Sequence, residues 1–161
     1  MSELDDLVRD LVLANRILAH EQVLDAYGHV SARHPKDPGR YFISVSRSPE
    51  LVTRDDIIEC WLDGRPVKDE KRPLYIERHI HGAVYEARPE VMSVVHSHAI
   101  EVLPFSISPT PLRPVLHSAG PLGHRIPVWD IADRFGDTTL LVTDMAQGRD
   151  LADRLADDRA V

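Results

Sequence analysis

Two stretches of this sequence decide both its fold and its candidate chemistry: Tyr75-Ile76-Glu77-Arg78-His79-Ile80-His81-Gly82-Ala83-Val84-Tyr85 and Val91-Met92-Ser93-Val94-Val95-His96-Ser97-His98. In the first stretch, apolar residues recur at helical spacing. This predicts an amphipathic helix of about four turns that begins after Pro73 and is ended by Pro89. The second stretch alternates as a strand does, so His96 and His98 are expected to share one face. The sequence therefore predicts two neighbouring imidazoles directly after a helix that carries Glu77.

A His-x-His pair on a strand suits one metal ion, because neutral imidazoles at positions i and i+2 project in the same direction. The alternative is two strand histidines that bond to backbone carbonyls, and the pair alone does not decide between them. Glu77 favours the metal hypothesis, since the return of the chain places it beside the pair as a ligand or as an acid/base group. Its own alternative is a solvated helix carboxylate next to Arg78. We expect the ring nitrogens of His96 and His98 to converge, with Glu77 within hydrogen-bonding reach, directly or through one water.

The remaining pattern predicts a mixture of helices and short strands. Apolar spacing and a capping-box start at Ser2 predict a helix over 3–20, and Asp144 is expected to cap a final helix. Thr53 and Asp56 indicate a one-turn helix cap. Six prolines between Pro104 and Pro127 exclude a long helix there and predict loop and short strand. Strands are predicted at 30–33, 41–45, 57–62 and 140–143, the first two forming a hairpin.

Composition sets further bounds on the function. A chain of 161 residues with a net charge of −7 and 43% hydrophobic residues fits one globular domain over 1–161. No apolar run is long enough to span a membrane, and the acidic start lacks the features of a secretory signal, so a cytoplasmic location is expected. The single cysteine, Cys60, excludes a disulfide framework or a thiolate zinc cluster. The acidic balance argues against binding to nucleic acid, whereas sixteen arginines suit a small anionic substrate.

The two stretches 75–85 and 91–98 together resemble the signature of the class II aldolase/adducin family, including the interval of nineteen residues between Glu77 and His96. The resemblance extends over essentially the whole chain and includes two further motifs, Gly28-His29-Val30-Ser31-Ala32-Arg33 and Ile43-Ser44-Val45-Ser46-Arg47-Ser48. The Ser46-Arg47-Ser48 form and Pro114-Val115-Leu116-His117 favour one branch of the family over the sugar-phosphate aldolases. That branch contains pyridine-dicarboxylate decarboxylases and an enzyme of aminocoumarin antibiotic synthesis.

The resemblance implies an α/β fold, a three-layer α/β/α class II aldolase-like domain around a mostly antiparallel sheet. It also implies a homotetramer with active sites between subunits. His96 and His98 would bind a divalent metal ion such as Zn, Mn or Fe, and Glu77 would be the catalytic acid/base. The implied substrate-binding residues are Gly28, His29, Ser31, Ser46 and Arg47, with His29 standing where many members have Asn. Structural alternatives stay open for three of them: Gly28 permits a positive φ, Ser31 pairs in a strand, and Arg47 lies on the surface.

One family feature is missing from the sequence. The family supplies a third histidine ligand from an Arg-Gly-His-Gly-like strand near its C-terminus, and this sequence ends at Val161 where that strand should begin. The domain is therefore expected to lack its C-terminal strand and helix and to bind metal weakly or not at all. Three explanations stay open: a tail omitted from the sequence, a naturally short protein, or substitution by His117 or His124.

The resemblance implies a metal-dependent lyase that cleaves a carbon–carbon bond of a small oxygenated, anionic substrate by aldol cleavage or decarboxylation. Both reactions proceed through an enolate, whose developing charge a divalent ion stabilises. Two other classes stay open. Two histidines and a carboxylate also match the facial triad of non-haem iron oxygenases, here acting on an aromatic 2-oxo acid, and oxygen consumption would distinguish that reaction. A non-catalytic, adducin-like interaction module is the third, although the presence of Glu77, His96 and His98 argues against it.

Overall fold

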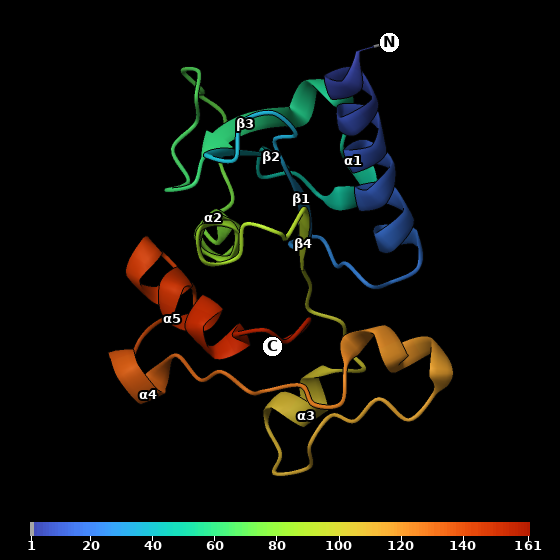
Figure 1. Ribbon diagram of the computed structural model, residues 1–161, viewed down its shortest axis with the longest axis vertical. Coiled ribbons are helices and arrows are strands. Elements are labelled where there is room, and N and C mark those ends of the chain that lie inside the picture. Colours follow the sequence, from blue (N-terminus) through green and yellow to red (C-terminus); the bar gives the residue numbers. More distant parts are fainter. Residues whose placement is uncertain (1) are drawn as a thin grey trace.

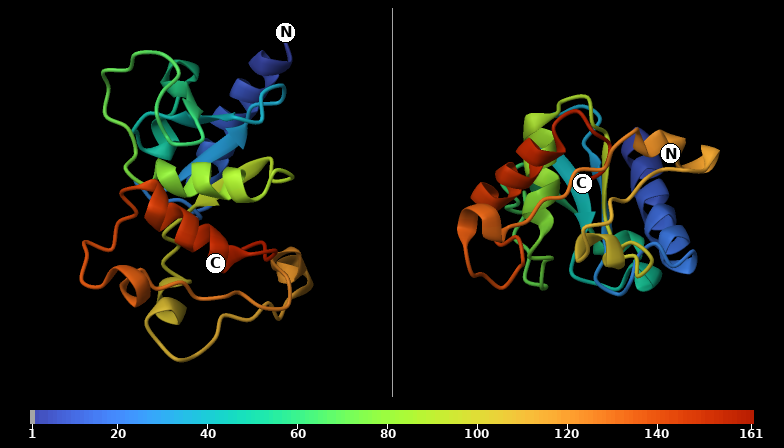
Figure 2. Two further views of the ribbon diagram at one scale, coloured as in Figure 1. Left: turned by 60° about the vertical axis from the view of Figure 1, so that its left-hand side comes forward. Right: turned by 90° about the horizontal axis from the view of Figure 1, so that it is seen from below.

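The computed structural model describes residues 2–161 and arranges them in three layers (Figure 1). The middle layer is a four-stranded antiparallel sheet in the order β3-β2-β1-β4. Its strands are β1 (His29–Arg33), β2 (Arg40–Ser44), β3 (Ile57–Trp61) and β4 (Ser93–His96). Helix α1 (Glu3–His20) lies on one side of the sheet, and α2 (Arg78–Ala87) lies on the other with α5 (Met145–Leu155) packed on it (Figures 1 and 2). The predicted three-layer fold and the 30–45 hairpin are confirmed.

Alternation along the strands divides the apolar side chains between two cores. On one face, Val30 and Phe42 pack with Leu11 of α1 and Leu24. On the other face, the buried cluster consists of Tyr41, Ile43, Cys60 and Tyr85, and Tyr85 comes from α2. Because neighbouring strand residues point to opposite faces, Ser31 of β1 points toward α2, between residues that point toward α1. This places a serine hydroxyl inside the core beneath α2.

Side-chain caps start the helices where the sequence predicts them. The backbone N–H of Asp5 donates to Ser2 Oγ (3.2 Å), and the Asp5 carboxylate accepts from the Ser2 backbone N–H (3.0 Å), which completes a capping box for α1. Asp144 accepts from the Gln147 backbone N–H (2.9 Å) at the start of α5. The predicted cap at Thr53 also forms, at the start of the 3₁₀ turn η2 (Arg54–Asp56), which follows η1 (Pro49–Leu51).

Helix α2 is shorter than the predicted four turns. It has 10 residues and begins at Arg78, because Glu77 is its N-cap and the preceding Tyr75 is held in a loop by a hydrogen bond from its hydroxyl to the Arg47 carbonyl. The helix lies very close to the end of β3. A Cβ at Gly82 would stand 1.9 Å from the Leu62 carbonyl oxygen, so only glycine permits this approach.

Strand β4 also ends earlier than predicted, at His96 instead of His98. The reason is the register with β1, whose first residue, His29, pairs with His96. Beyond that pair the described sheet offers β4 no partner, so His98 lies just after the end of the strand.

Residues 99–143, which we call the connecting segment, run from β4 to α5 as a long loop away from the sheet (Figures 1 and 2). The segment holds only short helical turns: α3 (Leu103–Ser106), η3 (His117–Leu122) and α4 (Ala132–Phe135). The short strand expected in the proline-rich part is absent from these residues. The strand predicted at 140–143 is also wrong, because Leu140 has a φ of +66° and is 69% exposed. Of the helices described in residues 2–161, none is both long and apolar enough to cross a membrane.

Candidate metal centre

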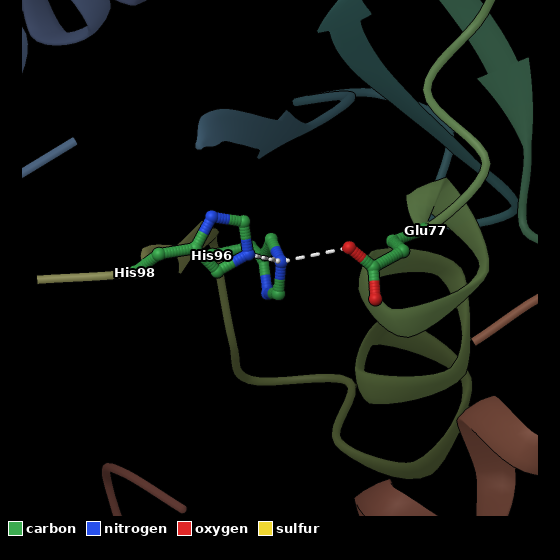
Figure 3. Close-up of side chains that lie close together, drawn as sticks. All are labelled: Glu77, His96 and His98. Carbon is green, nitrogen blue, oxygen red and sulfur yellow. Dashed lines mark hydrogen bonds and ion pairs between the residues drawn. The ribbon is translucent and has the colours of Figure 1, made fainter. Parts of the chain in front are cut away.

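The side chains of Glu77, His96 and His98 converge as the sequence predicts (Figure 3). Glu77 Oε2 lies 3.0 Å from His96 Nε2, and His98 Nε2 lies 3.0 Å from the same nitrogen. The two imidazole rings stand edge to face, at an interplanar angle of 89°. One ligand atom from each of the three residues lies within 4.8 Å of the others, so a single cation can contact all three.

Glu77 reaches this position because it is the last residue before α2. As the N-cap it makes no side-chain bond to its own helix, which leaves the carboxylate free to turn toward His96. Its second oxygen, Oε1, accepts a hydrogen bond from the Val142 backbone N–H (3.3 Å). Burial tends to raise the pKa of Glu77, but the hydrogen bond and charge interaction with His96 outweigh it and hold that pKa below its usual value. The group is therefore a carboxylate near neutral pH.

Asp25 supports His98 from the opposite side. The Asp25 carboxylate lies 3.1 Å from His98 Nδ1 and also accepts hydrogen bonds from the Tyr27 and Gly28 backbone N–H groups, at 2.9 and 2.7 Å. Burial raises the pKa of Asp25, but these amide bonds and His98 outweigh it, so the net pKa is lowered. A carboxylate that accepts the Nδ1 proton leaves His98 Nε2 with its lone pair toward Glu77 and His96. Metal-binding histidines commonly have such a partner.

The donor set fits a divalent cation. Two imidazole nitrogens and one carboxylate oxygen suit zinc, iron or manganese, and the Asp25–His98 pair already fixes the tautomer that a ligating His98 needs. Neither of the two histidines considered as substitute ligands, His117 and His124, belongs to the metal-capable group found among residues 2–161. Both lie exposed in the connecting segment.

A cavity of about 310 Å³ opens beside these residues. Its walls come from five separate stretches of the chain, and the polar or aromatic lining residues include Tyr27, His29, Ser46, Tyr75, Glu77 and His98. Thr139, Leu140 and Leu141 of the connecting segment form the remaining side. A second cavity of about 330 Å³ lies next to β3, but it contains no imidazole, and its Glu70 and Arg72 pair with each other. The first cavity therefore combines space with the candidate ligands.

The structure distributes the predicted substrate-binding residues unevenly around this cavity. His29 and Ser46 line it. The Ser31 hydroxyl instead lies in the core, 2.6 Å from His81 Nδ1 and 2.7 Å from the Tyr85 hydroxyl. Ser31 itself pairs with residues of β2 and β4, as the structural alternative expects. The Arg47 side chain is directed elsewhere: it is 45% exposed, donates to the Leu51 carbonyl (3.0 Å) and approaches Asp56 (3.4 Å).

Gly28 does not line the cavity, although its neighbours Tyr27 and His29 do. Its φ is not positive, so the alternative that it serves a left-handed conformation is wrong. A Cβ at this position would stand 2.8 Å from Leu24 Cδ2 and 3.0 Å from the His96 carbonyl oxygen. Glycine is favoured here because a side chain would have to displace Leu24 and would crowd the end of β4.

The structure brings four further residues to the site whose roles the sequence does not predict: Asp25, Tyr75, His81 and Tyr85. The His29 ring lies 4.1 Å from that of Tyr75 and 5.0 Å from that of His96, measured between ring centroids. His29 Nδ1 lies 2.8 Å from His81 Nε2. The position of His81 four residues after Glu77 on a helix was the one available signal, since such residues share a face. Nothing in the spacing indicates Asp25.

Comparison with known proteins places the chain in a family. A family model described as Class II Aldolase and Adducin N-terminal domain matches residues 9–161, and the chain belongs to this family. It is 42% identical over 127 residues to Decarboxylase tropJ of Talaromyces stipitatus, covering 78% of this chain and 48% of the relative. It is 36% identical over 96 residues to a methylthioribulose-1-phosphate dehydratase of Acidiphilium cryptum, covering 57% of this chain and 43% of that protein.

A solved structure of an aldolase II superfamily protein from Pseudomonas syringae has the same fold, with a TM-score of 0.77 at 23% sequence identity. The match covers 98% of this chain and 62% of the solved chain. The chain thus spans about half the length of the curated relatives that it matches.

Proposed function

We propose that this member of the class II aldolase and adducin family is a divalent-metal-dependent lyase that cleaves a carbon–carbon bond of a small oxygenated, anionic substrate. The observation that carries the proposal is the convergence of Glu77, His96 and His98 at the edge of a cavity. The similarity to a decarboxylase supports a lyase, and the similarity to a dehydratase is compatible with one, since both reactions build negative charge beside a carbonyl. Aldol cleavage and decarboxylation are the two candidate reactions.

His96 and His98 would hold the cation, with Glu77 beside them, and the cation would supply Lewis-acid stabilisation of the charge that develops on a carbonyl oxygen. Asp25 keeps the Nδ1 proton of His98, so that Nε2 stays available as a donor atom. The Asp25 carboxylate is itself held by hydrogen bonds from the Tyr27 and Gly28 amides. The orientation of His98 is therefore set before a metal ion binds.

Glu77 is the residue we propose for proton transfer. Its Oε2 is the oxygen on the side of the histidines, whereas Oε1 is occupied by the Val142 N–H. A carboxylate in this position can accept a proton from a substrate hydroxyl or return one to the carbon left by cleavage. The cavity is large enough for a substrate of a few carbon atoms, and we propose that His29 and Ser46 contact it. Suitable substrates carry two adjacent oxygens, as in 2-oxo acids and 2-hydroxy ketones.

We further propose that the chain assembles as a homotetramer. The support is the family and the exposure of large apolar residues in the connecting segment, including Ile107 at 87% and Val115 at 88%. Light scattering at micromolar concentration should give a mass of several chains, and a monomer alone would contradict this proposal.

The decisive test of the lyase proposal supplies the 161-residue chain with manganese or zinc and a panel of 2-oxo acids and 2-hydroxy ketone phosphates. Release of carbon dioxide or an aldehyde should require metal and proceed without oxygen consumption. Glu77→Gln should abolish turnover, and Glu86→Gln, which changes an exposed carboxylate on the same helix, should retain it. Turnover that consumes oxygen would instead show an oxygenase, and equal activity of Glu77→Gln would remove Glu77 from the mechanism. No metal-dependent turnover of any panel member would contradict the lyase proposal for this chain.

A further inference from the structure

A chain of four polar side chains leads from the cavity into the core beneath α2. His29 Nδ1 lies 2.8 Å from His81 Nε2, His81 Nδ1 lies 2.6 Å from Ser31 Oγ, and Ser31 Oγ lies 2.7 Å from the Tyr85 hydroxyl. All four residues are at most 1% exposed. Groups this deeply buried are stable only when each donor meets an acceptor, so the hydrogen bonds along these four side chains must run in one direction. That direction can be derived from the inner end.

The inner end is the phenol of Tyr85. Among residues 2–161, Ser31 Oγ is the one acceptor within hydrogen-bonding distance of the phenol oxygen. If Ser31 donated to Tyr85, the phenol proton would be left inside the core without an acceptor. Burial also raises the pKa of Tyr85, so the phenol keeps that proton. Tyr85 must therefore donate to Ser31.

The direction then follows step by step to the cavity. Ser31, which accepts from Tyr85, donates its own proton to His81 Nδ1. Burial lowers the pKa of His81 to about 3, so the ring is neutral and holds one proton, which must be on Nε2. His81 Nε2–H donates to His29 Nδ1. A neutral His29 with an occupied Nδ1 lone pair carries its proton on Nε2.

The outer end, His29 Nε2, has no hydrogen-bond partner among the residues that the structure describes. Some side-chain atoms without a hydrogen-bond partner, such as Ser44 Oγ and His79 Nδ1, are completely enclosed by protein. His29 Nε2 is not one of these enclosed atoms. His29 Nε2 therefore keeps contact with open space, and the space that His29 lines is the cavity beside Glu77.

We propose that His29 donates an Nε2–H hydrogen bond to an oxygen of the substrate, and that Ser31 and His81 are positioning residues that fix this polarity. This donor favours a substrate oxygen that only accepts, such as that of a carbonyl, carboxylate or enolate, because a hydroxyl would also need an acceptor for its own proton. The Ser31 hydroxyl thus acts on the substrate through His81 and His29 instead of by contact. The identity of the oxygen rests on the proposed function, whereas the polarity of the chain does not.

The polarity is measured on the metal-free 161-residue chain by ¹⁵N NMR of labelled histidines, with the His29 signals assigned from a His29→Gln variant. The expected wild-type tautomer of His29 has its proton on Nε2. Ser31→Ala removes the donor to His81 Nδ1 and should raise the fraction of the other tautomer severalfold. Tyr85→Phe is the matched control: the Ser31 hydroxyl still has only His81 as an acceptor, so the tautomer should not change.

Three results would overturn the assignment of polarity. These are a proton on His29 Nδ1 in the wild type, a tautomer that is unchanged in Ser31→Ala, and a change in Tyr85→Phe as large as that in Ser31→Ala. The last result would show that the tautomer of His29 responds to any loosening of the core and not to the Ser31 hydroxyl in particular.

The contact with substrate is tested with oxalate, a planar mimic of an enolate acid, by calorimetry in buffer with a fixed excess of zinc. His29→Leu should weaken oxalate binding by about tenfold or more, because a hydrogen bond to a charged oxygen is lost. His29→Gln, which keeps an N–H donor, should stay within about threefold of wild type. Equal affinity of His29→Leu and wild type would overturn the donor role alone. No oxalate binding by wild type would contradict the donor role together with the proposed function.

Discussion

The layered part of the molecule, which is the sheet with α1, α2 and α5, buries its large apolar side chains, whereas the connecting segment exposes several of them. Ile43 and Tyr85, between the sheet and α2, are each 1% exposed, whereas Ile107 and Val115 of the connecting segment are 87% and 88% exposed. The layered part contains all four strands and the three longest helices. Residues 99–143 contain only helical turns of four to six residues.

The contrast explains how the site is built. Glu77 is the N-cap of α2 and His96 is the last residue of β4, while His98 lies just after β4 and is held by Asp25. The connecting segment adds only the wall at 139–141 and the Val142 N–H that bonds to Glu77. Groups that must hold a metal need fixed geometry, and a wall does not. We therefore expect substitutions in the two parts to differ in kind as well as in size.

Glu77→Gln should produce the largest effect on activity. The amide cannot take a proton, so turnover of a verified substrate should fall by about 10²- to 10⁴-fold. Since Glu77 is only partly buried and lies outside the apolar clusters, the free energy of unfolding should change little. Kinetics and urea unfolding of the same preparation check both statements, and a large loss of stability would make Glu77 a structural residue instead.

Ile43→Ala and Ile107→Ala compare the two parts directly. Ile43→Ala leaves a cavity against Tyr41, Cys60 and Tyr85 and should lower the free energy of unfolding by about 2–5 kcal/mol. Ile107→Ala in the monomeric chain should change it by less than about 0.5 kcal/mol. Urea unfolding at low protein concentration measures both. Similar losses would show that the connecting segment is packed as tightly as the layers.

Asp25→Asn tests the support of His98. The amide does not fix the Nδ1–H tautomer as a carboxylate does, so affinity for zinc should fall by about 10- to 100-fold. Asp10→Asn, on the exposed surface of α1, should leave the affinity unchanged. Calorimetric zinc titration provides the comparison, and equal affinity in both variants would mean that Asp25 does not act through His98.

Acid should destabilise the layered part through His81 before its carboxylates are protonated. The unfolded chain binds a proton on this histidine below about pH 6.5, whereas burial holds its folded pKa at about 3. The stabilisation is complete above pH 6.5 and is lost as pH falls toward 3. The contribution of His81 is about 1.4 kcal/mol per pH unit well below pH 6.5. Urea unfolding between pH 4.5 and 7 measures the slope, which His81→Gln should reduce. The same slope in the variant would contradict neutral burial of His81.

The sequence predicted the regular parts of the fold well because their signals are local. The helix at 3–20, the 30–45 hairpin, the strand after Asp56 and the Asp144 cap each depend on spacing or capping within a few residues. The ends of α2 and β4 were wrong because tertiary contacts set them: Tyr75 bonds to Arg47, and β1 begins at His29.

The candidate site was predictable in part for the same reason. The closeness of His96 and His98 follows from a separation of two residues, and that of Glu77 follows from the order of helix and strand. Asp25 and the chain from His29 to Tyr85 depend on pairing between elements that are distant in sequence, which no spacing reveals. Apolar residues at 140–143 predict a strand, but the Val142 N–H donates to the Glu77 side chain instead of to a neighbouring strand.

The central claim, that His96 and His98 are ligands of one divalent cation beside Glu77, is tested most directly by zinc titration of the 161-residue chain and of the double variant His96→Ala/His98→Ala. The wild-type chain should bind one zinc ion weakly enough for a mild chelator to remove it, because two imidazoles and at most one carboxylate leave the ion with more solvent ligands than a site of three histidines does. The double variant should lose this site while keeping the circular dichroism spectrum of the wild type. Equal zinc binding by both proteins, or none by the wild type, would contradict the claim.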